Sequence, residues 1–294
     1  MPDVHDPTSG QVTIVSVSYN SMAVLPMMLQ SLPAGTSVII VDNASTDTTA
    51  LQDLCRRHSA RLILNSKNCG FGAACNQGGR LALTEFVLFL NPDACLESDT
   101  LDQLVSAARR YPKASAMNPR IAESDGSPSF HRSSRLMPRS ERMPHGWPAN
   151  DREVSVLTGA ALFVRRTDFL AVDGFDPKIF LYHEDDDLSR RLRRDRGPIM
   201  FIRDASVVHI GGASSERSPE IAALKAWHMA RSRVYGARKH GQPLPFLSAL
   251  SSAIISLFAL DMLISARRRA KNIAYFKGVI STLQDGGAAL DASP

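Results

Sequence analysis

Residues 86–93 read Phe-Val-Leu-Phe-Leu-Asn-Pro-Asp, an apolar run that ends in a polar turn. A short continuous apolar run bounded by a turn signal is typical of a strand buried on both faces of a parallel sheet. Proline fixes φ and lacks a backbone donor, so the strand is expected to end here. By itself Asn91-Pro92-Asp93 is an ordinary strand terminator. At the edge of a sheet it can also present a carboxylate to a cleft.

Three earlier apolar runs, at residues 12–19, 37–41 and 61–65, have the same character as residues 86–90. Amphipathic stretches separate them, such as the one through Leu51, Leu54 and Cys55. This alternation predicts an α/β protein with a mainly parallel central sheet and flanking helices, a Rossmann-like arrangement. Ligands of such sheets bind at the carboxyl ends of the strands.

Polar clusters follow three of the predicted strands, at residues 18–20, 42–47 and 91–93. Parallel strands place such clusters along one rim, which is the geometry of a nucleotide site. Each cluster alone is also compatible with loop or cap chemistry. Asp47 in particular has the position of an N-cap for the following helix.

With 294 residues, 44% of them apolar and 21% charged, the chain can bury one large core or two modest ones. This composition excludes a disordered protein. The formal net charge of +5 and the isoelectric point near 9.2 favour anionic partners, such as nucleotide phosphates or a phospholipid surface. Nucleic acid is not expected, because the arginines cluster beside acids or an apolar helix rather than among exposed aromatic residues.

The cellular compartment is indicated by the cysteines and by the first residues. The four cysteines form no Cys-x-x-Cys pair, which argues against disulfides or zinc and favours a reducing compartment. Residues 1–10 are polar and rich in turn formers, so we expect a disordered tail and no signal peptide. The expected location is the cytoplasm.

The regular pattern is interrupted at residues 118–151, which are rich in Pro, Ser, Arg and His. We expect a mobile basic loop, with a functional loop and a disordered segment as open alternatives. Strand and helix patterns return at residues 152–215. They include a helix that begins in the acidic run 184–187 and a strand at 199–210.

The remaining chain is predicted to be helical. Residues 246–264 carry a single charge, Asp261, and are followed by Arg267-Arg268-Arg269 and Lys271. An apolar helix beside a basic run is typical of peripheral contact with an anionic membrane surface, and a buried core helix is the alternative.

Two further features carry polar chemistry. Residues 68–76 form a glycine-rich turn that leads into a helix, although they match neither the P-loop nor the dinucleotide fingerprint. The acids at 184–187 repel one another unless a cation or a proton relieves them, and such crowding suits a general base. His209 ends the last apolar strand, where a histidine is either structural or a metal ligand.

Together these motifs resemble the family 2 glycosyltransferases of GT-A fold, and within them the rhamnosyltransferase-like branch. The resemblance covers residues 12 to about 215. The matching segments are 15–20, 41–47, 68–76, 91–93, 157–160, 174–176, 184–188 and His209.

The resemblance implies a set of site residues. Those expected to bind the nucleotide sugar are Tyr19, Asn20, Asp42, Asn43, Asp47, Gly70, Phe71, Asn76, Asn91 and Asp93. Asn91 replaces the first acid of the family's Asp-x-Asp motif, so Asp93 is the expected ligand of Mg²⁺ or Mn²⁺ and His209 a candidate second ligand. The Glu-Asp pair implies Asp185 as the catalytic base, with Asp187 as a rival and Glu184 beside it. Thr158, Gly159 and Glu184 are expected on the acceptor side.

The implied reaction is an inverting transfer from a nucleotide-diphospho-sugar, with dTDP-rhamnose as the first choice. The acceptor is a hydroxyl of a glycan, polysaccharide or polyprenyl-diphosphate-linked molecule at the cytoplasmic face of the inner membrane. A transferase that uses UDP-hexose or UDP-N-acetylhexosamine is one alternative, and a non-catalytic nucleotide-sugar-binding module is another. A homodimer is left open.

These assignments divide the chain into a tail, a catalytic domain, a helical region and a second tail. The ranges are 1–10, 11–215, 216–285 and 286–294. Within the catalytic domain, we expect a nucleotide-sugar half at 11–117, the mobile basic loop at 118–151, and an acceptor and catalytic-base half at 152–215.

Overall fold

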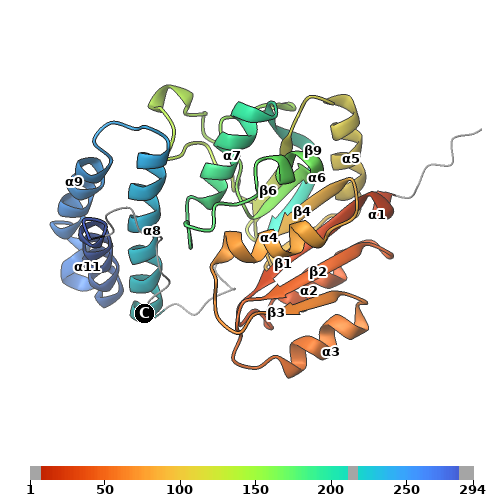
Figure 1. Ribbon diagram of the computed structural model, residues 1–294, viewed down its shortest axis with the longest axis horizontal. Coiled ribbons are helices and arrows are strands. Elements are labelled where there is room, and N and C mark those ends of the chain that lie inside the picture. Colours follow the sequence, from red (N-terminus) through yellow and green to blue (C-terminus); the bar gives the residue numbers. More distant parts are fainter. Residues whose placement is uncertain (1–7, 211–217, 285–294) are drawn as a thin grey trace, which may run out of the picture.

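The computed structural model describes residues 8–210 and 218–284, in which one central sheet has helices on both faces (Figure 1). The order of the strands is β3-β2-β1-β4-β8-β6-β9-β5, and β7 pairs with β9. The strands are β1 (Val12–Ser18), β2 (Ser37–Asp42), β3 (Arg61–Leu64), β4 (Phe86–Leu90), β5 (Ala94–Leu96), β6 (Ala116–Glu123), β7 (Arg152–Glu153), β8 (Ala161–Arg165) and β9 (Ile199–His209).

The first half of the sheet is parallel, as the sequence predicts. β1 pairs with β2 and β4, and β2 pairs with β3, all in parallel. Ser18 lies opposite Asp42 in the register, so the polar residues that follow β1 and β2 meet at the same edge. The chain therefore builds the predicted rim, at the carboxyl ends of its parallel strands.

The second half of the sheet is more mixed than the sequence indicates. β8 runs antiparallel to both β4 and β6, and β5 runs antiparallel to β9. β8 thus joins the second half of the chain to the first, since it lies between β4 and β6. The class of fold is confirmed, with the parallel pairing concentrated in the first half.

The connection expected at residues 118–151 begins later than predicted, because residues 118–123 belong to β6. The register of β6 against β9 shifts between Pro119 and Arg120, and this irregularity accommodates a proline inside the sheet. Residues 124–151 contain a single helical turn, Arg139–Glu141. They are anchored by the indole N–H of Trp147, which donates to the carbonyl of Ile121 at 3.0 Å.

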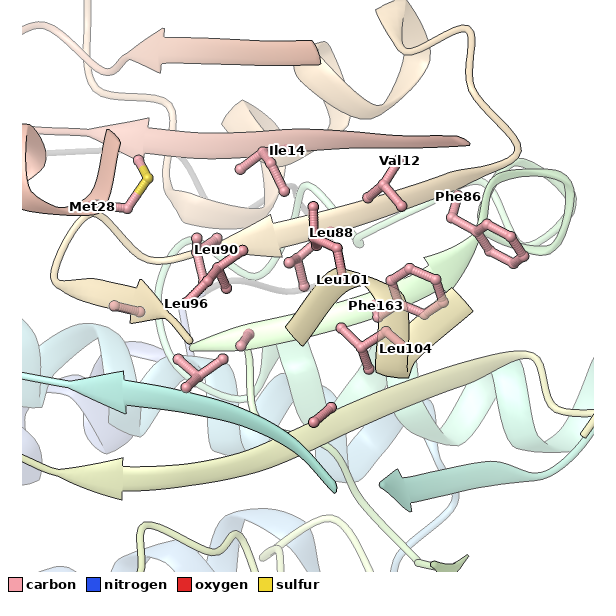
Figure 2. Close-up of a cluster of buried hydrophobic side chains, with 14 of the residues drawn as sticks. Val12, Ile14, Met28, Phe86, Leu88, Leu90, Leu96, Leu101, Leu104 and Phe163 are labelled. Carbon is pink, nitrogen blue, oxygen red and sulfur yellow. The ribbon is translucent and has the colours of Figure 1, made fainter. Parts of the chain in front are cut away.

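Alternate residues of the buried strands pack into two cores, one on each face of the sheet. Ile14 and Leu88 point to the core that includes Met28 and Leu101 (Figure 2). The side chains of the next residues along the strands, such as Phe89, enter the opposite core. The helices that precede α8 are α1 (Thr8–Gln11), α2 (Leu25–Gln30), α3 (Thr49–Arg57), α4 (Phe71–Leu81), α5 (Thr100–Arg110), α6 (Arg166–Ala171) and α7 (Glu184–Asp195).

Within the region 216–285, which was predicted to be helical, the structure has four helices among residues 219–281. Its helices are α8 (Pro219–Lys239), α9 (Pro245–Leu257), α10 (Asp261–Ile264) and α11 (Ala266–Ser281). α8, α9 and α11 stand together at one side of the molecule, drawn in blue in Figure 1, and share a small core that includes Ala230, Ala253 and Val279. None of the described helices combines the length and hydropathy that crossing a bilayer requires.

α8 packs against the segment that precedes α7. The ring of His228 stacks on Phe180 with centroids 4.2 Å apart, and the hydroxyl of Ser232 donates to the carbonyl of Leu181 at 2.9 Å. Most of the predicted tail at 1–10, the predicted tail at 286–294 and the predicted boundary at 215/216 lie outside the described residues. Thr8–Gln11 form a short helix that packs near α5, where the guanidinium of Arg109 donates to Gln11.

Candidate active site

The ends of β1 and β2 are joined by side-chain hydrogen bonds. Asp42 is fully buried, and its two carboxylate oxygens accept the backbone N–H and the hydroxyl of Ser45 at 2.9 and 2.5 Å. The hydroxyl of Ser45 in turn accepts the N–H of Asn20 at 2.8 Å, and the amide oxygen of Asn20 accepts the N–H of Thr46 at 2.9 Å. Asp42 and Asn20 therefore stabilise the loop after β2 through hydrogen bonds to its residues. Tyr19 is 49% exposed at the same rim.

Asp47 lies farther along this loop and is exposed to solvent. Its carboxylate accepts the N–H of Thr49 at 2.9 Å, while Thr48 occupies the N-cap position of α3. The side chain thus stabilises the start of the helix from one residue before the observed N-cap, and the prediction that Asp47 is itself the N-cap was wrong by one residue.

Asn43 holds the glycine-rich turn against the end of β2. Its amide donates to the side-chain oxygen of Asn68 at 2.8 Å and accepts the N–H of Cys69 at 3.0 Å. Gly70 adopts φ +88°, and a Cβ at this position would lie 2.5 Å from the carbonyl oxygen of Phe180. Only glycine fits both the backbone conformation and this close approach.

Phe71 and Asn76 of α4 bind the turn to the segment before α7. The Phe71 ring meets the edge of Phe175 at 6.1 Å between centroids. The side-chain amide of Asn76 makes two hydrogen bonds to the backbone of Phe175. Its nitrogen donates to the carbonyl at 2.7 Å, and its oxygen accepts the N–H at 2.8 Å. The structure thus gives Asn76 a positioning contact with Phe175, and the nucleotide contact expected of it remains a prediction.

Asp93 and His209, the two predicted metal ligands, lie side by side. The residue after Asp93 pairs with His209 in the register of β5 and β9. His209 Nε2 lies 3.2 Å from Asp93 Oδ1, and Asp93 is 2% exposed. The hydrogen bond to Asp93 raises the pKa of His209. His209 Nδ1 is buried without a hydrogen-bond partner among the described residues.

Glu123 lies near this pair, with its Oε2 3.9 Å from His209 Nδ1. Within residues 8–210 and 218–284, no group of three or more His, Cys, Asp or Glu side chains is arranged to hold one ion. Asn91 is half-buried beside this corner, and its backbone N–H donates to the carbonyl of Ala160 at 2.9 Å.

The segment Thr158–Ala160 connects this corner to α7. The side-chain oxygen of Asn118 accepts the N–H of Thr158 at 2.7 Å, and its amide nitrogen donates to the carbonyl of Ala161 at 2.6 Å. The next N–H, that of Gly159, donates to Asp185 Oδ2 at 3.0 Å. Thr158 and Gly159 therefore lie beside the acidic start of α7, between Asp185 and the corner of Asp93.

The backbone directly before α7 is strained. Tyr182 and His183 both adopt left-handed conformations, with φ of 65° and 69°. Consecutive non-glycine residues in this region are costly and concentrate at functional sites. The turn that they make brings Glu184 and Asp185 to the helix N-terminus, where the helix dipole favours negative charge.

Asp185 is half-buried, and two backbone N–H groups hold its carboxylate in place. Oδ2 accepts the N–H of Gly159, and Oδ1 accepts the N–H of Asp186 at 2.9 Å. Burial and the neighbouring charge of Asp186 raise the pKa of Asp185 above its ordinary value. A fixed carboxylate with a raised pKa is suited to accept a proton.

Glu184 has a different environment. It is buried, and its Oε2 has no hydrogen-bond partner among the described residues. Burial, Asp185 and Asp186 together raise the pKa of Glu184 well above its ordinary value. This environment favours the neutral carboxyl, which can donate a hydrogen bond.

Asp187, the predicted rival of Asp185, is engaged in an ion cluster with α8. It is fully buried, and its carboxylate lies 2.8 Å from each of three donors, on Arg191, Lys239 and His240. Although burial alone would raise its pKa, His240, Arg191 and Lys239 lower it to about 2. This cluster joins α7 to α8 and leaves Asp185 as the acid that faces Gly159.

The sequence reasoning did not single out Asp186 and its two histidines. Asp186 is 3% exposed and lies 2.7 Å from His183 Nδ1 and 3.3 Å from His131 Nε2. His183 is three residues before Asp186, a spacing that could have suggested the contact. Nothing in the sequence relates Asp186 to His131, which comes from the segment 124–151. Asn118 was missed for the same reason.

Comparison with known proteins relates this site to one family. Residues 13–170, more than half of the chain, match the model of the family described as Glycosyl transferase family 2. The match spans β1 to α6 and ends before α7.

Two relatives extend over most of the chain. An N-acetylglucosaminyl-diphospho-decaprenol L-rhamnosyltransferase of Mycobacterium tuberculosis is 32% identical over 262 residues, which cover 77% of this chain and 84% of the relative. Rhamnosyltransferase WbbL of Escherichia coli is 25% identical over 254 residues, which cover 78% of this chain and 93% of the relative.

A solved structure with the same fold is the mannosyltransferase PcManGT from Pyrobaculum calidifontis, in complex with GDP-Man and Mn²⁺. It superposes with a TM-score of 0.59 at 17% identity, over 94% of this chain and 88% of that one. This likeness confirms the GT-A fold. The family match over residues 13–170 and the 32% identical relative show that the chain belongs to glycosyl transferase family 2.

Proposed function

We propose that the chain transfers L-rhamnose from dTDP-rhamnose to a hydroxyl of a polyprenyl-diphosphate-linked acceptor, with inversion at the anomeric carbon. The choice of sugar and acceptor follows the relatives, since one is a decaprenol-linked rhamnosyltransferase and the other a rhamnosyltransferase. The observation that carries the proposal is the backbone of Thr158–Ala160. It joins the corner of Asp93 and His209 to the carboxylate of Asp185.

In this reaction, a bond forms between the acceptor oxygen and the anomeric carbon while the bond from that carbon to the diphosphate breaks. The proton of the acceptor hydroxyl passes to Asp185, and the nucleoside diphosphate leaves with the bonding electron pair. Asp185 suits this role because Gly159 and Asp186 fix both of its oxygens and its pKa is raised. The displacement needs no covalent enzyme intermediate.

Glu184 is proposed to bind the acceptor. Its Oε2 has no hydrogen-bond partner among the described residues, and the raised pKa favours the neutral carboxyl, which can donate a hydrogen bond to an acceptor oxygen. Thr158 lies on the same side and is half-buried. These two groups would orient the hydroxyl toward Asp185.

Asp93 and His209 are the residues proposed to hold Mg²⁺ or Mn²⁺. The residues fit such an ion, because a carboxylate oxygen and an imidazole nitrogen lie 3.2 Å apart. Neighbouring ligands in an octahedral magnesium shell are separated by about 3 Å. The donor diphosphate and water would complete the shell, and the ion would neutralise the charge that develops on the leaving group.

The nucleotide is proposed to lie along the rim formed by the loops after β1 and β2 and by the glycine-rich turn. Tyr19 is exposed there. The buried side chains of Asp42 and Asn43 hold the loops through hydrogen bonds. Nothing in these contacts separates thymidine from uridine. A UDP-hexose or UDP-N-acetylhexosamine donor is therefore the second candidate, and thermal shift with dTDP against UDP distinguishes the two.

We also propose peripheral contact with the cytoplasmic face of the membrane through α9. Leu247, Ile254, Ile255 and Phe258 form an exposed apolar stripe, and Phe258 is 83% exposed. The basic residues 267–269 at the start of α11 are also exposed. An apolar face beside positive charge is complementary to an anionic lipid surface.

The experiment that tests the proposed function measures release of dTDP and formation of the glycosylated lipid by mass spectrometry. The purified chain is incubated with Mn²⁺, dTDP-rhamnose and a polyprenyl-diphosphate N-acetylglucosamine acceptor. We expect product with dTDP-rhamnose and little with UDP-glucose or UDP-N-acetylglucosamine. Turnover only with a UDP-sugar would select the second candidate. A chain that binds nucleotide sugars but turns over none would be a non-catalytic binding module.

A further inference from the structure

Asp186 lies between two imidazoles that come from different parts of the chain. Its Oδ2 is 2.7 Å from His183 Nδ1, and its Oδ1 is 3.3 Å from His131 Nε2. His183 directly precedes α7, whereas His131 is contributed by the segment 124–151. This segment therefore places a side chain directly beside the acidic start of the helix that carries the proposed base.

The environment of His131 favours its charged form. One ring nitrogen, Nε2, lies 3.3 Å from Asp186 Oδ1, and the backbone of Ser133 also favours the charged ring. Although burial would lower the pKa of His131, Asp186 and Asp185 raise it to about 9. The side chain is 30% exposed, so water can still exchange its proton.

The position of His131 is fixed by contacts on both sides of it. The preceding residue, Phe130, meets the edge of Phe201 at 5.6 Å between centroids. The following residue, Arg132, is paired with Met143: its backbone carbonyl accepts the N–H of Met143 at 2.8 Å, and its Nε donates to the Met143 carbonyl at 3.0 Å. His131 is thus held near α7 by packing and hydrogen bonds and does not depend on the ion pair alone.

The charged groups around Asp185 determine how readily its carboxyl group ionises. Glu184 and Asp186 are its neighbours on α7, Gly159 donates from the segment before β8, and His131 faces it from the segment 124–151. The negative charge of Asp186 opposes ionisation of Asp185, and the positive charge of His131 favours it. His183 contacts Asp186 on its other oxygen. Asp187 is already neutralised by Arg191, Lys239 and His240.

We propose that His131 is a positioning residue for glycosyl transfer: as an imidazolium paired with Asp186, it offsets the negative charge beside Asp185 and keeps that carboxylate ionised. The inference rests on the proposed role of Asp185 as base. It gives the segment 124–151 a defined part in the reaction, namely to supply a positive charge beside Asp186 and Asp185.

The test is the pH dependence of kcat/KM, whose acid limb reports ionisation of the base in the free enzyme. In His131→Gln, the positive charge is lost, and we expect the acid limb to move up by about one pH unit. In Asp186→Asn, the negative charge is lost, so the limb should move down. The double variant should lie between the two. Damage to the fold would not move the limb in opposite directions.

Rescue and control variants sharpen this test. His131→Lys restores a positive charge and should return the limb toward that of the wild type. His145→Gln, an exposed histidine of the same segment, should leave the limb in place. Limbs that coincide for the wild type, His131→Gln and Asp186→Asn would overturn the proposal.

A second measurement is independent of turnover. NMR titration of the histidine side chains should show a ring that titrates near pH 9, is absent in His131→Gln, and titrates at a lower pH in Asp186→Asn. If His131 titrates near its ordinary value in the wild type, the pairing is refuted. If Asp185→Asn retains full activity, the base assignment fails, while the titration still reports whether the His131 pair exists.

Discussion

The backbone N–H of Gly159 donates a 3.0 Å hydrogen bond to Oδ2 of Asp185. The carbonyl of the next residue, Ala160, accepts the N–H of Asn91 at 2.9 Å. Two adjacent residues therefore hold the acidic start of α7 and the turn of Asp93 in a fixed relation through their backbones. Because these bonds use backbone atoms, the relation does not depend on the side chains of the connecting residues.

The glycine-rich turn offers a direct test of the packing. Gly70→Ala places a Cβ 2.5 Å from a backbone oxygen at a positive φ, and we expect it to lower the free energy of unfolding by about 2–4 kcal/mol. Gly126→Ala is the matched control, because Gly126 also has a positive φ but no atom within 4 Å. Its cost should be about 1 kcal/mol. Urea unfolding measures both, and equal costs would refute the close approach to Phe180.

The Asp187 cluster predicts a stability that depends on pH. The pKa of this buried carboxyl is depressed to about 2, so its contribution is full above the unfolded value near 4 and is lost as the pH falls toward 2. At pH 7, Asp187→Asn should lower the free energy of unfolding by about 2–4 kcal/mol. The difference from the wild type should shrink near pH 2.5. Asp195→Asn, at an exposed site on the same helix, should leave the melting temperature unchanged, and an Asp187→Asn deficit that is independent of pH would contradict the account.

The proposed ion site predicts that Mn²⁺ strengthens the binding of dTDP. Asp93→Asn and His209→Asn should each reduce Mn²⁺-dependent binding, by about 10–100-fold for loss of a ligand contact. Isothermal titration with and without Mn²⁺ measures this. Asp204→Asn, an exposed carboxylate on β9, serves as the control. Binding that is independent of Mn²⁺ in the wild type would remove the ion from the mechanism.

The α9 stripe predicts binding to anionic vesicles. The double variant Ile255→Ser with Phe258→Ser should lower the affinity for phosphatidylglycerol vesicles by at least tenfold, because both side chains are largely exposed and available for insertion. Leu83→Ser, at a 91% exposed leucine before β4, should have no effect. Sedimentation with vesicles measures the partition. Equal binding of the wild type and the double variant would place membrane contact elsewhere.

The sequence was sufficient to predict the parallel half of the sheet and its rim. Strands such as residues 86–90 are buried on both faces, so they appear as continuous apolar runs. The residues that follow them then fall at the same edge by topology. Tyr19, Asp42 and Asp93 could be assigned to one rim for this reason.

The sequence was not sufficient where structure depends on distant partners. Residues 118–123 form part of β6 although Pro119 argues against a strand, because pairing with β8 and β9 outweighs the local preference. The separation of roles among the acids of α7 depends on His131 and on His240, each more than 40 residues away. No local pattern distinguishes an acid that is paired with α8 from an acid that faces Gly159.

The measurement that tests the central claim most directly is the single-turnover rate of Asp185→Asn with dTDP-rhamnose and the lipid acceptor, together with its affinity for the donor. If Asp185 is the base, the transfer rate should fall by about 10²–10⁴-fold, while the dissociation constant for the donor stays within about threefold. Asparagine keeps the size of the side chain and cannot accept the proton. Transfer at the wild-type rate by a variant that binds the donor normally would show that another group is the base.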